Sequence, residues 1–143
     1  MPSNPRDDPH VVIVGGGFGG LYAAKVLAAA GTRVTVVDRR NFHLFQPLLY
    51  QVATGGLSPG DIASPIRSVL KRGRRVRVLQ DEAVDVIPME RRIVLRGAAL
   101  DYDVLIVATG SRTSYFGHDE WAAHAPGLKC VEDALERSLR RNT

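Results

Sequence analysis

Cysteine is almost missing from this chain of 143 residues, where it occurs once, as Cys130. A single cysteine excludes a disulfide within the chain, a CxxC redox pair and any metal site built from several thiolates. The four histidines, at positions 10, 43, 118 and 124, show no ligand-like spacing on one element. We therefore expect no metal site.

Long apolar runs are also lacking, and none approaches the roughly 20 residues that a membrane-spanning helix requires. The first nine residues contain two acids and three prolines, without the apolar segment of a secretion signal. We therefore expect 1–9 to be a flexible leader and the chain to stay in the cytoplasm. The aromatic content is low, at 6%.

The charge is biased towards arginine, with a formal net charge of +4. Six basic residues fall between positions 67 and 77, which could attract a phosphate-rich partner such as an anionic membrane. No aromatic residues lie among these charges, so nucleic acid binding is not expected. The simpler interpretation is a solvated helix end followed by the start of a strand.

The strongest local pattern is a strand, a glycine-rich turn, a helix and a second strand. Val11–Val14 is a β-branched run typical of a buried parallel strand. It is followed by Gly15–Gly20, a segment with helical spacing that ends at Gly31, and the strand Arg33–Val37. Together these segments predict one βαβ unit with a right-handed crossover.

The glycines in this unit match the spacing of a dinucleotide-binding turn. Gly15 allows the tight turn, Gly17 lets the backbone approach a pyrophosphate, and Gly20 permits close packing of helix on strand. The helix N-terminus then favours the bound anion. Asp38, at the end of the second strand, can accept both ribose hydroxyls of an adenosine and would repel a 2′-phosphate. This unit alone does not distinguish NAD from FAD.

The rest of the chain predicts an α/β fold with further strands and helices. Residues 41–59 lack periodicity and are expected to form a long, functional loop that could include one helical turn. Val104–Val107 is a second apolar run, expected in the middle of the parallel sheet near the first strand. A helix is expected with Ser64 as its cap, Pro65 as its first residue and Gly73 as its end. A strand is expected around Val76 and Val78, followed by two antiparallel strands over 83–87 and 91–95 beside the main sheet. The last expected element is a helix over 131–141.

Two segments resemble known families. Tyr102–Gly110, an apolar strand that ends in Ala-Thr-Gly, resembles flavoproteins with two dinucleotide-binding domains, which makes FAD the better choice of cofactor. Phe42–Gly55, with the sequence FHLFQPLLYQVATG, closely resembles type II, non-proton-pumping NADH:quinone oxidoreductases. Disulfide reductases carry a redox-active cysteine pair in this region, and sulfide:quinone oxidoreductases also depend on cysteines, which the chain lacks here.

This resemblance implies a Rossmann-type FAD/NAD(P)-binding domain and a set of FAD-binding residues. The pyrophosphate would be held by Gly15, Gly16, Gly17, Phe18 and Gly19, and Gly20 would belong to the same cofactor-binding turn. The ribose and its surroundings would be contacted by Asp38 and Arg39, and His43 would lie close to the FAD. The flavin ring would have Gln46 and Pro47 near it. The backbone of Val84 would meet the adenine, and Thr109 and Gly110 would border the cofactor. His43 as a loop cap and Val84 as a core residue remain alternatives. No catalytic side chain is expected in this stretch.

The resemblance also implies that the domain is incomplete. Residues 10–143 would be a partial FAD domain ending in a linker helix, without the NADH domain and the C-terminal membrane-anchoring region. The parent enzyme would transfer hydride from NADH to FAD and two electrons to quinone, as a peripheral protein on the cytoplasmic face of a membrane. The missing part, or a partner subunit, would complete it, and the isolated chain would have little or no activity.

Two other functions stay open at this point. The chain could be a non-catalytic remnant or subunit that binds an adenine dinucleotide. It could also belong to another FAD-dependent pyridine-nucleotide oxidoreductase, although the segment Phe42–Gly55 argues against this.

Overall fold

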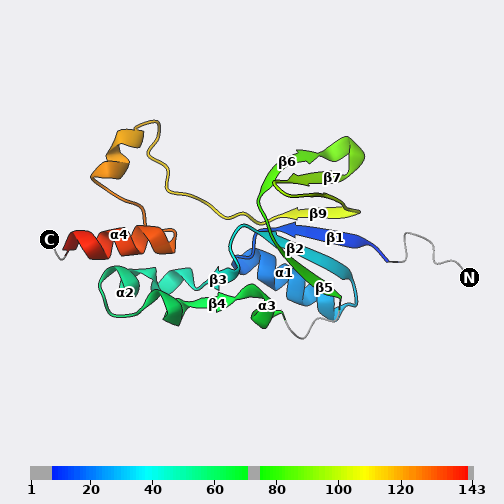
Figure 1. Cartoon of the computed structure of the whole chain (residues 1–143), viewed down its shortest axis with the longest axis horizontal. Helices are drawn as coiled ribbons and strands as arrows, with labels where there is room; N and C mark the ends of the chain where they lie inside the picture. The colour runs from blue at the N-terminus through cyan, green and yellow to red at the C-terminus, as the bar shows by residue number, and fades with distance from the viewer. Residues whose placement is uncertain (1–7, 71–74, 142–143) are drawn as a thin grey trace, which may run out of the picture. The chain divides into compact units, whose positions relative to one another are not determined.

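A computed structural model describes residues 8–70 and 75–141 of the chain. The chain divides into two compact units. The first, here called the sheet unit, comprises 1–43 and 65–110, and the second, the helical unit, comprises 44–64 and 111–143. Figure 1 labels the elements of both.

The sheet unit is built on four parallel strands in the order β5-β2-β1-β9. Their bounds are β1 His10–Val14, β2 Arg33–Asp38, β5 Val76–Gln80 and β9 Val104–Val107. The two central strands are rich in valine and isoleucine, because both of their faces are covered and β-branched side chains pack well on a pleated sheet. The expected βαβ unit is confirmed, with α1 Phe18–Ala29 between β1 and β2 (Figure 1).

Successive side chains of β1 point to opposite faces of the parallel sheet, and each face is covered by different elements. Val11 and Ile13 pack with α1 and with α3 Ile66–Val69, whereas Val12 packs on the opposite face, as the two-residue period of a strand requires. That opposite face is covered by three antiparallel strands, β6 Ala83–Ile87, β7 Arg92–Leu95 and β8 Ala99–Asp101. The antiparallel excursion is therefore confirmed, with β8 as a third strand that the sequence did not indicate.

The position of β9 differs from the expectation. It pairs with β1, near which it was expected, but among the described residues it is the edge strand of the sheet and not a central one. Val104 and Val107 are consequently 48% and 66% exposed. An apolar run fits a buried strand, but the run itself does not reveal whether a neighbour covers its second side.

Residues 41–59 are more regular than the expected loop. They contain β3 Phe42–Leu44, the 3-10 helix η1 Gln46–Leu48 and α2 Leu49–Ala53, and the 3-10 helix η2 Pro59–Ile62 follows at their end. β3 forms a two-stranded ribbon with β4 Ala63–Pro65. Ser64 is thus extended and does not cap a helix, and α3 begins at Ile66 without a side-chain cap. Gly73, the expected stop, lies outside the described residues.

The helical unit packs α2 against α4 Val131–Arg141, which has the predicted bounds. Its core is formed by Leu49, Val52, Ile62 and Ala134. A short 3-10 helix, η4 Asp119–Ala123, precedes α4. The structure contains, over residues 8–70 and 75–141, no helix long and apolar enough to cross a membrane.

Candidate functional site

The glycine turn after β1 adopts conformations that side chains would prevent. Gly15 has φ +108, and a Cβ on it would lie 2.3 Å from the carbonyl oxygen of Ala108. A Cβ on Gly20 would lie 1.8 Å from the carbonyl oxygen of Gly15, so the start of α1 packs directly on the turn. A Cβ on Gly17 would meet nothing within 4 Å. The turn is closed around Gly15 and Gly20 and open at Gly17.

The first turn of α1 faces this open side. Gly17 is the N-cap residue, and no side chain caps the helix. The first N–H groups of an α-helix have no partner within the helix, and the helix dipole places partial positive charge there. An uncapped helix start next to an open glycine turn has the donors and the charge that a phosphate requires.

The carboxylate of Asp38 points towards the glycine turn. The N–H of Gly16 donates to Oδ2 of Asp38 at 2.5 Å, and the N–H of Arg40 donates to Oδ1 at 2.7 Å. Each carboxylate oxygen can accept two hydrogen bonds. Asp38 therefore holds the turn and keeps acceptor capacity for a hydroxyl group. The backbone of Arg40 was not singled out from the sequence, because a backbone donor carries no residue-type signal.

His43, in β3, also contacts the turn. Its Nδ1 lies 3.1 Å from the carbonyl oxygen of Gly16, and since a carbonyl only accepts, Nδ1 must be the protonated nitrogen. The imidazole ring meets the ring of Phe18 edge to face, with centroids 4.8 Å apart. His43 and Asp38 thus bind opposite groups of the same residue, the C=O and the N–H of Gly16. The neighbouring Arg39 is exposed.

The end of β9 lies beside the same turn. Ala108 donates its N–H to the carbonyl of Val14 at 2.8 Å, and its own carbonyl faces Gly15. Thr109 and Gly110 follow directly, and Gly110 has φ +73. Ala108 was not among the predicted site residues, although its small side chain within the Ala-Thr-Gly motif could have indicated the close approach.

For three of the predicted site residues, the described part of the chain shows no contact with the glycine turn. Val84 lies in β6, half exposed, where the register with β7 shifts. Gln46 and Pro47 belong to the helical unit, in η1, and Nε2 of Gln46 donates to the carbonyl of Lys129 at 3.2 Å. The sheet unit therefore brings together the glycine turn, Asp38, His43 and the end of β9.

A family model described as pyridine nucleotide-disulphide oxidoreductase matches residues 9–139. The chain belongs to this family. The α/β fold class expected from the sequence is confirmed.

Named relatives confirm the resemblance to type II enzymes. The chain is 51% and 49% identical, over 94% of its length, to the type II NADH:quinone oxidoreductases NdhA and Ndh of Mycobacterium tuberculosis. It matches a solved structure of NDH2 from Plasmodium falciparum in complex with NADH, with a TM-score of 0.79 and 30% identity over 92% of the chain. The chain spans about 30% of the length of the two mycobacterial relatives and 28% of the solved structure.

A sulfide:quinone oxidoreductase from Aquifex aeolicus has a TM-score of 0.81 but 24% identity, covering 94% of the chain and 32% of that structure. At that level of identity, the match shows a shared fold alone.

Proposed function

We propose that this chain is the FAD-binding portion of an NADH:quinone oxidoreductase. The observation that carries the proposal is the hydrogen bond from Gly16 to Asp38, which sets a carboxylate beside an uncapped helix start. A diphosphate at the helix start and a ribose at the carboxylate are two adjoining parts of one dinucleotide. The similarity to the mycobacterial type II enzymes favours FAD as that dinucleotide.

The residues present fit the adenosine diphosphate half of FAD. The open space at Gly17 lets a phosphate approach the backbone, which a side chain there would block. Asp38 would accept hydrogen bonds from the ribose, with Arg39 nearby, and Thr109 and Gly110 would border the cofactor. Bound FAD would supply the redox chemistry, taking up hydride from NADH and passing two electrons to a quinone.

His43 would act as a positioning residue within this site. It contacts Gly16 and Phe18, and through them it would orient the glycine turn towards the cofactor. Val84, Gln46 and Pro47 are proposed from the resemblance only, at the adenine and near the flavin ring. Under this proposal residues 10–143 are a partial FAD domain, and NADH binding, quinone binding and peripheral attachment to the cytoplasmic face of a membrane depend on other polypeptide.

The proposal is tested by the cofactor preference of the purified chain. Quenching of flavin fluorescence would be measured for FAD and for FMN, which lacks the adenosine part. We expect FAD to bind, ADP to compete with it, and FMN to bind at least tenfold more weakly than FAD. The reason is that the glycine turn and Asp38 would contact the adenosine diphosphate half of FAD. Asp38→Asn should weaken FAD binding by about tenfold, equivalent to about 1.4 kcal/mol, whereas Asp85→Asn, at an exposed acid of the same unit, should not.

Equal binding of FMN and FAD would contradict the proposal. Binding of NAD in preference to FAD would instead support the non-catalytic adenine-dinucleotide-binding protein. NADH oxidation with a soluble quinone should be negligible for the chain alone, and robust turnover would show that the site is more complete than proposed.

A further inference from the structure

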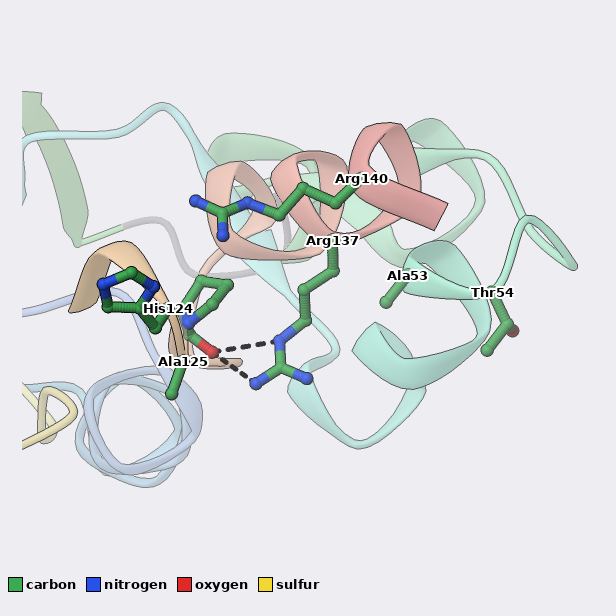
Figure 2. A pocket seen from close by; sticks show the side chains of 7 residues that line it. Ala53, Thr54, His124, Ala125, Arg137 and Arg140 are labelled. Atoms are coloured by element: carbon green, nitrogen blue, oxygen red, sulfur yellow. Dashed lines mark hydrogen bonds between the residues drawn. The ribbon is translucent and has the colours of Figure 1, made fainter. Parts of the chain in front are cut away.

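A second site lies in the helical unit, away from the glycine turn in sequence. Seven residues line an open hollow of about 590 Å³, which is in the usual range for a small-molecule site. Figure 2 shows that they come from the end of α2, the segment after η4, and one face of α4. They are Ala53, Thr54, His124, Ala125, Pro126, Arg137 and Arg140.

The lining of the hollow combines basic side chains with small apolar ones. Arg137 and Arg140 lie three residues apart on α4 and therefore on the same side of that helix, and His124 adds an imidazole. None of its described lining residues is acidic. Two carboxylates outside the lining interact with these arginines. Glu136 forms an ion pair with Nη2 of Arg140 at 2.6 Å. Asp133 accepts hydrogen bonds from the N–H groups of Lys129 and Cys130 and interacts electrostatically with Arg137.

The guanidinium group of Arg137 is held in place by the protein. Its Nε donates to the carbonyl oxygens of Pro126 and Gly127 at 3.0 and 3.1 Å, and its Nη2 also donates to Pro126 (Figure 2). Neutral carbonyls orient this group but leave its charge in place. An ordered arginine has less conformational entropy to lose when it binds an anion, and within 8–70 and 75–141 no partner is recorded for its Nη1.

Arg140 is held in a similar way. Its Nη1 donates to the carbonyl of Ala123 at 2.6 Å, at the end of η4. Both arginines therefore connect α4 to the segment 123–127. Glu136 offsets part of the charge of Arg140, whereas the hydrogen-bond partners of the Arg137 guanidinium are neutral carbonyls. Two ordered guanidinium groups together with small apolar residues suit a tetrahedral anion that carries an apolar part.

We propose that this hollow binds a phosphate group, either that of a lipid headgroup or a free phosphate. Phosphate is favoured over a carboxylate because its oxygens point in several directions and can accept from two guanidinium groups at once. The proposal is independent of the flavin site, because it uses residues of the helical unit alone.

The test uses the full chain labelled with ¹⁵N and measures the arginine Nε–Hε signals during titration with inorganic phosphate at constant ionic strength. Binding to vesicles of phosphatidylglycerol and phosphatidylcholine is measured in parallel by sedimentation, with pure phosphatidylcholine as the reference. Shifts of the Arg137 and Arg140 signals with phosphate support a free-phosphate site. Binding to the anionic vesicles alone, lost in the variants below, supports the lipid source.

Arg140→Gln should weaken binding by about five- to tenfold. Thr54→Glu should weaken it similarly, because it places a carboxylate at the exposed edge of the hollow without removing any guanidinium bond. If Arg140→Gln lowers the melting temperature markedly, Thr54→Glu decides the question. The control is Arg112→Gln, which removes the same charge from an exposed site of the same unit outside the hollow.

Two results would overturn the proposal. One is the absence of binding to both phosphate and anionic vesicles. The other is an equal loss of binding in Arg112→Gln and Arg140→Gln, which would show attraction by net charge and no defined site.

Discussion

The carboxylate of Asp38 accepts the N–H of Gly16 at 2.5 Å and thereby ties the end of β2 to the turn that follows β1. The two residues are 22 positions apart in sequence. The bond satisfies a backbone donor that would otherwise point into the candidate site, and it places the negative charge where a ribose would lie. A single contact therefore serves the fold and the proposed binding of FAD.

Loss of this carboxylate should also weaken the fold. Asp38→Asn replaces a charged acceptor by a neutral one, and hydrogen bonds to charged groups contribute about 1.5–3 kcal/mol. Because Asp38 is only partly buried, we expect a decrease of about 1–2 kcal/mol in the free energy of unfolding, measured by urea denaturation. An unchanged stability would show that the bond to Gly16 contributes nothing.

Two glycines of the turn should respond differently to alanine. Gly20→Ala should destabilise the chain by several kcal/mol, since its Cβ would lie 1.8 Å from a backbone oxygen and overpacking of this kind is costly. Gly17→Ala should leave the melting temperature nearly unchanged, because its Cβ meets nothing, but should weaken FAD binding by at least tenfold. Thermal melting and flavin titration separate the two effects. Similar stability losses in both variants would refute the distinction between packing and binding.

The start of α4 should be sensitive to acid. Burial opposes ionisation of Asp133, but hydrogen bonds from the N–H groups of Lys129 and Cys130 and the charge of Arg137 lower its pKa below the ordinary value of 3.8. A lowered folded-state pKa stabilises the fold above the ordinary value, and this contribution is lost as the pH falls through the lower folded value.

Asp133→Asn should therefore reduce stability at pH 7 and flatten the decrease in stability below about pH 4. Denaturation at pH 7, 4 and 3 measures this dependence. A variant with the same loss of stability between pH 4 and 3 as the unchanged chain would exclude Asp133 as its source.

Within 8–70 and 75–141, β9 has a neighbour on one side only, and this open edge should promote self-association. An exposed edge strand presents unpaired backbone groups to other chains, and a lysine on such a strand opposes pairing. Val104→Lys should decrease the fraction of oligomer in sedimentation velocity experiments. Met89→Lys, at a fully accessible turn between β6 and β7, adds the same charge away from the edge and should have little effect. Equal effects of both would attribute the change to net charge.

Much of the sheet unit could be predicted because its signals are local. Val11–Val14 and Val34–Val37 are uninterrupted β-branched runs, and the glycines between them have a conformational requirement that few other residues meet. Within 41–59 the sequence predicts a loop with at most one helical turn, and α2 matches that turn, but β3 and η1 could not be predicted because elements of three residues are too short to show a period. β8 was missed for the same reason.

The candidate site could be predicted in part. Its glycines and Asp38 follow from their places at the ends of β1 and β2. The bond between His43 and the carbonyl of Gly16 could not be predicted, because it depends on where the chain returns after β2. The contact of Ala108 with Gly15 follows from the pairing of β1 with β9, and its signal in the sequence is the small side chain within the Ala-Thr-Gly motif, which was not used.

The most direct test of the flavoprotein site is a titration of the ¹⁵N-labelled chain with ADP, followed through the backbone amide signals of Gly15–Gly20. The signal of Gly31, which lies beyond the opposite end of α1, serves as the internal reference. We predict that the signals of the turn shift in a saturable manner while that of Gly31 does not, and that saturation requires at least tenfold more ADP in Gly17→Ala. Unchanged turn signals at saturating ADP, or an unchanged ADP affinity in Gly17→Ala, would contradict the proposed site.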